Sequence, residues 1–162
     1  QPLTLRQDDV AEPKGAAIEC RVCAEDVFND FLPDTGVVSY MALPDGDGVR
    51  NDTALYECYE VSVHYDPMVA KLIVHAPDRA TCIERTIAAL DAYQIVGFKT
   101  TIPFCRLVLD SAPFRTGIYS TFYVKEHWPI DLPQSFRAAL AGLAAAGFLE
   151  EDQRRQPLPS HD

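Results

Sequence analysis

The chain has 162 residues, of which 48% are hydrophobic and 23% are charged, and its formal net charge is −10. This composition is typical of one soluble globular domain, with or without a tail. The acidic balance argues against nucleic acid and against an anionic membrane surface as main partners, because both require a basic face on the protein. No apolar run approaches the ~20 residues that a membrane-spanning helix needs, so we expect no membrane partner.

The first segment, residues 1–14, is polar and contains prolines, and we predict that it is a lead-in linker. It has neither an initiator Met nor the apolar core of a signal peptide. We therefore expect the chain to be part of a longer polypeptide, with some of the chemistry outside these residues.

Five cysteines with irregular spacing predict no disulfide framework and favour a reducing, cytoplasmic location. Cys20 and Cys23 spell a CxxC motif, but they fall in an alternating segment that predicts a strand. Residues three apart in a strand point to opposite faces. We interpret both as structural thiols rather than as a zinc or redox site.

The strand signals come first along the chain. From Ala17 the alternation predicts a half-buried strand with Glu19 and Arg21 as neighbours on its polar face. Further strands are predicted at 37–43, where both faces are apolar, at 54–61 and at 68–76. A tight glycine-containing loop at 44–48 is expected to present Arg50.

The helix signals follow. Asp78 is a candidate N-cap for a helix over 79–93, and Thr100 or Thr101 for a second over 102–109. A loop is predicted at 114–117 and a short amphipathic helix at 121–127. Strands that precede helices predict an α+β fold with an antiparallel sheet. We assign this folded domain to residues 15–128. Residues 129–162 are interpreted as a helical and partly disordered tail, with its helix at 134–149.

Two patterns that could carry chemistry are weak. Ser62, His64 and Asp66 lie within five residues, whereas a catalytic triad usually draws its members from separate elements. We interpret them as an exposed strand edge that ends in an Asp-Pro turn. No glycine-rich loop precedes a helix, so no phosphate cradle is predicted.

Arg50 is the strongest candidate site residue. A guanidinium is always charged and offers a planar fork to a carboxylate, bicarbonate or phosphate. Arg50 follows a glycine turn that can aim its side chain into a cleft. The alternative is a structural ion pair. For Lys71 and His75, which share a strand face, structural roles are favoured.

Six short segments, taken together and in their order along the chain, say more than Arg50 alone. They are Gly15–Arg21 (GAAIECR) with Ala24-Glu25-Asp26, Phe31-Leu32-Pro33 with Gly36, Gly48-Val49-Arg50 with Asp52, Tyr65–Leu72 (YDPMVAKL), Asp78–Gly97, and Lys99-Thr100. Together they resemble the C-terminal domain of biotin carboxylase, the ATP-grasp component of the acetyl-CoA, propionyl-CoA, methylcrotonyl-CoA and pyruvate carboxylases. The resemblance covers about residues 3 to 128.

The resemblance implies a function for the longer protein. Its expected cofactors and substrates are ATP, Mg²⁺, bicarbonate and biotin, and its expected activity is the carboxylation of biotin on a carrier protein. The residue at the position of Arg50 contacts bicarbonate and the carboxyphosphate or biotin end of the site in that family. The position of Thr121 lies by the adenine pocket.

The resemblance also implies the partners. These are an upstream ATP-grasp core in the same chain, a biotin carboxyl carrier protein, and a second copy in a homodimer. We expect an acetyl-CoA or other acyl-CoA carboxylase, with pyruvate carboxylase as the alternative, and no activity from these residues alone. A non-catalytic module that holds subunits together is the second hypothesis. Departures from the family pattern include Ala16, Val27, Val96 and Thr101, and they bear on dimer contacts and loop conformation more than on fold.

Overall fold

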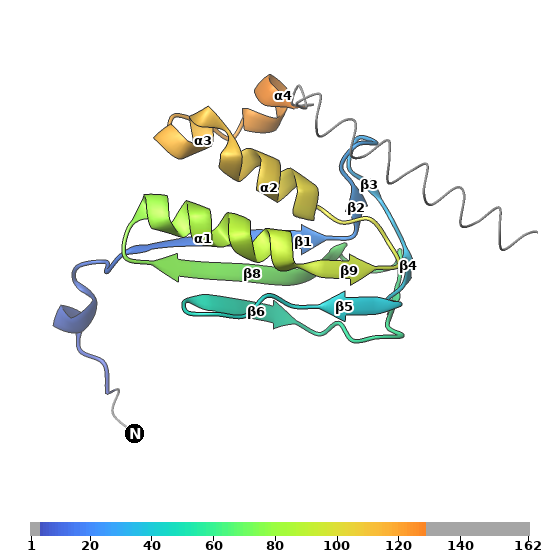
Figure 1. Ribbon diagram of the computed structural model, residues 1–162, viewed down its shortest axis with the longest axis horizontal. Coiled ribbons are helices and arrows are strands. Elements are labelled where there is room, and N and C mark those ends of the chain that lie inside the picture. The colour runs from blue at the N-terminus through green and yellow to red at the C-terminus, as the bar shows by residue number, and fades with distance from the viewer. Residues whose placement is uncertain (1–3, 129–162) are drawn as a thin grey trace, which may run out of the picture. The chain divides into compact units, whose positions relative to one another are not determined.

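The computed structural model of the chain describes residues 4–128 (Figure 1). The chain divides into two compact units, Gln1–Tyr123 and Val124–Asp162. Within residues 4–128, every strand and every helix except the one at Tyr123–His127 lies in the first unit. The predicted helix at 134–149 and the predicted disordered end lie outside the described residues.

The fold is an antiparallel α+β arrangement, as the sequence predicts. A three-stranded sheet has the order β1-β8-β6, with both neighbouring pairs antiparallel. Its strands are β1 (Ala16–Cys23), β8 (Met68–Ala76) and β6 (Val49–Thr53). Three small two-stranded sheets accompany it: β2 (Glu25–Asp26) with β3 (Leu32–Pro33), β4 (Gly36–Val37) with β7 (Glu60–Val61), and β5 (Tyr40–Ala42) with β9 (Gln94–Val96).

Most helices follow the strands in the chain; the exceptions are a 3-10 helix at the start and the first α-helix, which precedes β9. The helices are η1 (Gln7–Val10), α1 (Arg79–Ala92), α2 (Ile102–Asp110), α3 (Ala112–Thr116) and α4 (Tyr123–His127). None of the helices within residues 4–128 has the length and apolar character needed to cross a bilayer.

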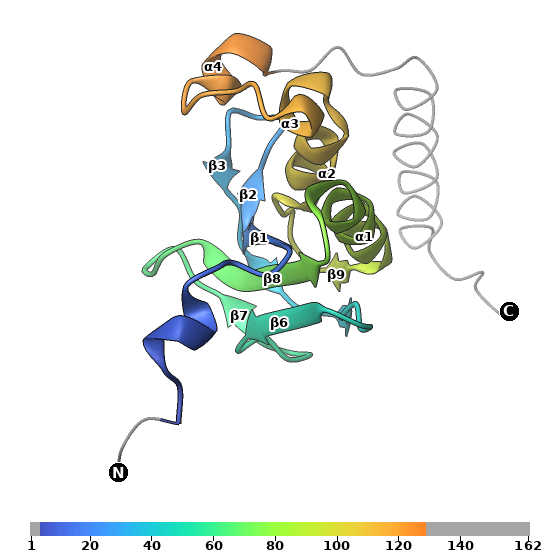
Figure 2. The same cartoon turned by 90° about the vertical axis from the view of Figure 1, so that its left-hand side faces the viewer.

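One face of the three-stranded sheet is covered by helices. Figures 1 and 2 show α1 and α2 on the same side of β1 and β8. The main core lies in between, because every second side chain of β1 and β8 points into it. Its buried members are Ile18, Cys20, Val22, Ala70, Leu72, Val74, Ala76, Cys82, Ile83, Ile87, Ala89, Leu90, Tyr93 and Leu109.

Helix α1 begins where the sequence predicts. The Asp78 carboxylate accepts hydrogen bonds from the Thr81 backbone N–H at 2.9 Å and from the Thr81 hydroxyl at 2.7 Å. These bonds satisfy a backbone donor that has no partner within the first turn of a helix. They also lower the pKa of Asp78, because both stabilise the ionised carboxylate.

The prediction of a strand over 54–61 is wrong. The nearest strand of the main sheet is β6, which ends before the predicted range begins. Within that range, only Glu60 and Val61 form a strand, β7. Cys58 adopts φ 71°, which does not continue a strand, and the Tyr59 N–H donates to the Tyr56 carbonyl within a turn. The alternation of apolar residues gave no signal for this backbone reversal.

The predicted central strand over 37–43 is divided. Residues 36–37 pair with β7, whereas residues 40–42 pair with β9. Gly36 and Gly97 meet close to this division, and a Cβ on Gly36 would lie 2.1 Å from the Gly97 carbonyl oxygen. The apolar pattern does not mark a central strand, because Val37, Tyr40 and Leu43 are exposed and Val38 is buried.

The predicted loop at 114–117 is also wrong, because residues 112–116 form α3. The Ser111 hydroxyl accepts from the Phe114 N–H at the start of this helix, and Gly117 ends it with φ 75°. The short helix predicted over 121–127 is present as α4, which begins two residues later.

Candidate functional site

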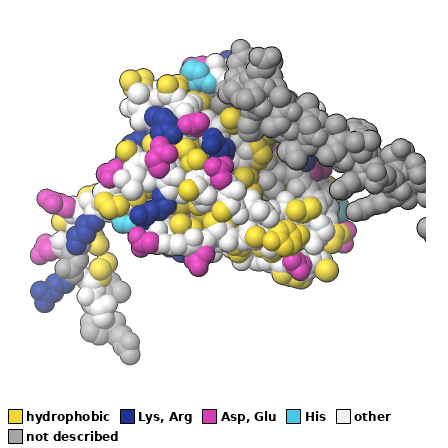
Figure 3. Space-filling model, in the orientation of Figure 1, with side chains coloured by type: hydrophobic (Ala, Val, Ile, Leu, Met, Phe, Trp, Pro, Cys, Tyr) yellow, Lys and Arg dark blue, Asp and Glu magenta, His cyan; other side chains and the backbone are white. Residues whose placement is uncertain are grey.

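The face of the three-stranded sheet opposite α1 and α2 carries charged residues in two adjacent rows. The strand register places Arg21, Lys71 and Asp52 side by side in one row. The next row holds Glu19, Ile73 and Arg50. The rows alternate with the buried side chains of β1 and β8, so they form the outer face of the sheet. Figure 3 views the molecule from the other side, that of α1, where acidic and basic side chains also lie close together.

Arg50 lies in this outer face, near the beginning of β6. Its side chain is 69% exposed, and its Nε is 3.1 Å from the Asp52 Oδ1. Its Nη2 donates to the Asp52 Oδ2 at 3.3 Å. Residues two apart in a strand share a face, so the strand itself brings the two side chains together. Within the described residues, Nη1 of Arg50 makes no hydrogen bond, and one edge of the guanidinium remains available to an anion.

A glycine bend precedes Arg50, as predicted. Gly48 has φ 72°, and a Cβ at this position would lie 2.2 Å from the His75 carbonyl oxygen. The bend lets the chain turn tightly against β8, and the His75 N–H donates to the Gly48 carbonyl at 2.8 Å. Arg50 therefore projects from a strand fixed to β8, whereas the sequence predicts that it projects from a loop.

An open cavity of about 350 Å³ adjoins the Arg50–Asp52 pair. It lies at the end of β6 and the start of β8. Its lining residues are Asp52, Thr53, Ala54, Met68, Val69, Ala70 and Lys71. Lys71 is half-buried and lies opposite Asp52 across the strand pair. The cavity thus has a cation and an anion on its polar side, next to the Arg50 guanidinium.

Sequence reasoning missed the role of Asp52 beside Arg50. The signal was present, because an acid two residues after an arginine in a strand lies on the same face. The sequence analysis did not use this signal, because it predicted no strand over residues 49–53 and expected Arg50 to project from the loop at 44–48. The equivalent pair on β1 was predicted and is present, with the Arg21 Nε 3.4 Å from the Glu19 Oε1.

The predicted weakness of a triad at Ser62, His64 and Asp66 agrees with the geometry. Ser62 Oγ accepts from the His64 backbone N–H at 3.1 Å, and Asp66 Oδ1 accepts from the Met68 backbone N–H at 2.8 Å. Both side chains therefore stabilise turns. These residues lie in a turn and not along a strand edge.

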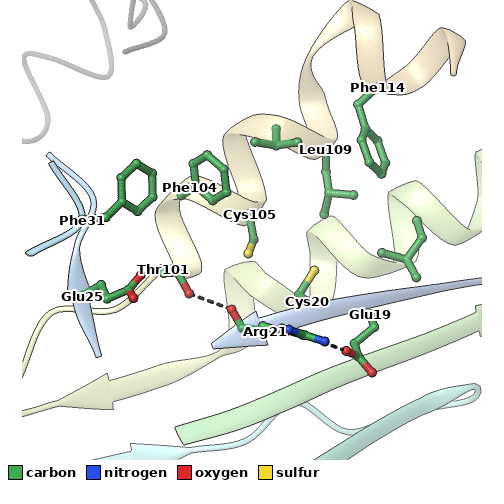
Figure 4. Close-up of a pocket in the computed structure, with 12 residues that line it drawn as sticks. Glu19, Cys20, Arg21, Glu25, Phe31, Thr101, Phe104, Cys105, Leu109 and Phe114 are labelled. Carbon is green, nitrogen blue, oxygen red and sulfur yellow. Dashed lines mark hydrogen bonds and ion pairs between the residues drawn. The ribbon is translucent and has the colours of Figure 1, made fainter. Parts of the chain in front are cut away.

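A second cavity, of about 280 Å³, lies between β1 and α2 (Figure 4). Its walls are mainly apolar, with Phe31 and Phe104 in edge-to-face contact at a centroid distance of 5.1 Å. Glu25 lies at its rim. Burial, and then the charge of Asp66, raise the pKa of the Glu25 carboxyl.

Comparison with known proteins gives the family. Residues 19–126 match the model of the biotin carboxylase C-terminal domain. The chain belongs to this family. The biotin carboxylase domain dimer of the Hydrogenobacter thermophilus 2-oxoglutarate carboxylase, solved with MgADP, ADP and bicarbonate, is similar in structure. Its TM-score is 0.75 at 38% identity, over 78% of this chain and 28% of that one.

Two sequence relatives of this biotin carboxylase domain carry different names. The propionyl-CoA carboxylase alpha chain of Ruegeria pomeroyi is 36% identical over 96% of this chain and 26% of its own length. A pyruvate carboxylase subunit of Methanothermobacter thermautotrophicus is 41% identical over 78% of this chain and 26% of its own length. The chain thus spans about a quarter of the length of these relatives.

The residues of this domain fit an anion but not a metal. Arg50 offers one unoccupied guanidinium edge on an exposed face, which suits bicarbonate or a carboxylate. Among residues 4–128, no group of three or more His, Cys, Asp or Glu side chains could hold a metal ion. This part of the chain therefore offers a free guanidinium edge and no such cluster of metal ligands.

Thr121, the second residue predicted for the site, is exposed in the turn before Tyr123. Within residues 4–128, no hydrogen bond joins it to Arg50. The structure leaves both residues accessible but does not bring them into contact, and their roles stay predictions.

Proposed function

We propose that this domain forms one wall of the active site of a biotin carboxylase, and that Arg50 binds bicarbonate or the carboxylate group derived from it. One observation carries the proposal. Asp52 fixes the Nε edge of the Arg50 guanidinium, while the opposite edge faces solvent from an exposed strand. A guanidinium held in this way needs little reorganisation when an anion binds.

The exposed Arg50–Asp52 pair supports a role for this domain in binding and orienting an anion. Another part of the protein would supply the metal ligands and a base. ATP and Mg²⁺ would supply the activation of bicarbonate when bound by that part. Arg50 would hold the resulting anion near the biotin of a carrier protein, and Asp52 would keep the guanidinium oriented. On the resemblance alone, we further propose that Thr121 lies on the adenine side of the site.

The same proposal extends to the acceptor substrate, the oligomeric state, the protein partner and the location. The carboxylase would accept an acyl-CoA or a keto acid. Acetyl-CoA and a role in fatty acid biosynthesis are our expectation, whereas the names of the relatives favour propionyl-CoA or pyruvate equally. We propose a homodimer, a carrier protein as partner and a cytoplasmic location. The isolated chain is expected to lack activity.

The decisive experiment substitutes Arg50 in the complete carboxylase that contains this domain. Arg50→Ala is expected to lower biotin-dependent carboxylation by about 100-fold, the usual effect of losing one preorganised donor to a developing anion. Arg50→Lys keeps the charge but loses the planar fork, so an intermediate loss is expected. Bicarbonate-dependent ATP cleavage and carboxylation of free biotin are the measurements.

Arg21→Ala is the matched control. Arg21 is also an exposed strand arginine paired with an acid two residues away. It is expected to keep activity within about threefold, because a surface ion pair contributes little. A near-normal rate for Arg50→Ala would remove Arg50 from the site and would favour a non-catalytic module. Equal losses in both variants would assign the effect to the charge of the whole face.

A further inference from the structure

Two cysteines from distant parts of the chain meet at the base of the cavity between β1 and α2. Cys20 lies on the buried face of β1, and Cys105 lies in α2. Both line the cavity, and Figure 4 shows their sulfur atoms projecting into the same space. Each thiol is the largest single influence on the pKa of the other.

The start of α2 is fastened to β1 by Thr101. The Thr101 hydroxyl donates to the Arg21 carbonyl at 2.8 Å and accepts from the Cys23 N–H at 2.9 Å. The Thr101 N–H donates to the Cys23 carbonyl at 3.0 Å. These three bonds fix the first turn of α2 against the end of β1, and Figure 4 shows the one between Thr101 and Arg21.

This attachment determines where Cys105 points. Cys105 is four residues after Thr101, so it lies on the same side of the helix, one turn further along. The same side faces the buried face of β1, which carries Cys20. The two sulfur atoms are therefore held near each other by backbone contacts and not by chance rotamers of flexible side chains.

We propose that Cys20 and Cys105 form a reversible disulfide that joins β1 to α2 under oxidising conditions. The reaction consumes two thiols and one peroxide of the hydrogen peroxide class. The Cys105 sulfur attacks a peroxide oxygen, the O–O bond breaks, and one water leaves. The Cys20 sulfur then displaces the hydroxyl from the Cys105 sulfur, the S–S bond forms, and a second water leaves.

The environment of the two thiols assigns their order of reaction. Hydrogen bonding from Cys20, together with Thr101, lowers the pKa of Cys105, because both stabilise its thiolate. The pKa of Cys20 is raised, first by the same hydrogen bond and then by burial. Cys105 is also partly exposed, whereas Cys20 is 5% exposed. Because Cys105 is the more accessible of the two, we assign it as the attacking thiol and Cys20 as the resolving thiol.

A third buried thiol provides an internal comparison. Cys82 in α1 borders the same core, but its sulfur donates to the Val74 carbonyl at 3.3 Å. Cys82 does not line the cavity. The exposed thiol of Cys58 reports whether an oxidant acts on the chain at all.

The test uses the full 162-residue chain, treated with hydrogen peroxide in its folded state and then alkylated. Digestion without reductant and mass spectrometry identify the linked peptides. We expect the Cys20–Cys105 peptide to exceed any other linked pair by at least about tenfold. The intact chain should become about 2 Da lighter through the loss of two hydrogens, and dithiothreitol should reverse the change.

Cys105→Ser should abolish this link, and Cys82→Ala should leave it. Two outcomes would overturn the proposal. One is that Cys20 and Cys105 remain alkylatable after unfolding while Cys58 is oxidised. The other is a predominant Cys20–Cys82 link. Peptide mapping of the unsubstituted chain decides between these results even where a variant fails to fold. The inference does not depend on the carboxylase activity.

Discussion

The two faces of the β1-β8-β6 sheet differ in what they contribute. The face under α1 and α2 is closed and apolar, with Leu72 and Val74 of β8 fully buried. The opposite face carries Lys71 and Asp52 in one row and Arg50 in the next, beside an open cavity. Successive residues of one strand therefore serve two purposes. The inner residues supply the free energy of folding, whereas the outer residues are free to bind.

This comparison predicts that substitutions at neighbouring positions of β8 have very different effects. Leu72→Ala removes a side chain with no exposed surface and is expected to lower the free energy of unfolding by about 2–5 kcal/mol. Lys71→Ala, one residue away on the outer face, should cost less than about 1 kcal/mol. Urea unfolding followed by circular dichroism measures both. Similar losses in the two variants would contradict the distinction between the faces.

The attachment of α2 to the inner face gives the next largest expected effect. Thr101→Val keeps the shape of the side chain but leaves the Arg21 carbonyl and the Cys23 N–H without their partner. An unsatisfied buried polar group costs about 1–3 kcal/mol, and a loss in this range is expected in urea unfolding.

Thr100→Val is the control for Thr101→Val, because the Thr100 hydroxyl makes only a 3.4 Å contact with the Ile102 N–H. It should change the free energy of unfolding by less than about 0.5 kcal/mol. If Thr101→Val were equally mild, α2 would not depend on this attachment.

On the outer face, Asp52→Asn is expected to separate binding from folding. The substitution keeps the size of the side chain but removes the charge that orients Arg50. Stability should change by less than about 1 kcal/mol, because exposed ion pairs contribute little. In the complete carboxylase, the KM for bicarbonate should rise more than kcat falls. A wild-type KM would show that Arg50 does not need this partner.

The smallest expected effect concerns the cap of α1, which covers the inner face. The pKa of Asp78 is lower in the folded chain than in the unfolded chain. Its contribution to stability is therefore complete above the ordinary Asp pKa and is lost as the pH falls through the lowered value. Asp78→Asn keeps a capping oxygen that does not titrate, so its urea midpoint should decline less between about pH 5 and pH 2. Parallel pH profiles for the two chains would argue against this contribution.

The sequence predicted the elements whose periodicity is local. Residues 16–23 alternate clearly, and Asp78 marks the start of α1, so both elements were found. The sequence could not predict the turn around Cys58, because a positive φ at a non-glycine residue leaves no trace in hydrophobic alternation. Nor could it predict that residues 36–42 change partners between two small sheets, since strand pairing depends on contacts distant in the chain.

The site shows the same limit. Arg50 was identified because a lone arginine after a glycine bend is chemically distinctive. Its placement beside Asp52, Lys71 and a cavity depends on the pairing of β6 with β8, which residue types alone did not indicate. The meeting of Cys20 and Cys105 was hidden for the same reason, because they lie in elements that are far apart in the chain.

The alignment of β6 on β8 has a consequence for the evolution of this surface. A shift of one residue in the pairing of β6 with β8 would point Arg50 into the apolar core and Asn51 toward solvent. Burying a guanidinium without an anionic partner costs so much free energy that the slipped form would be scarcely populated. Arg50, the residue proposed to bind an anion, thus also favours the correct register of β6 on β8. A chain without Arg50 would therefore lose a constraint on strand register as well as the proposed anion-binding group.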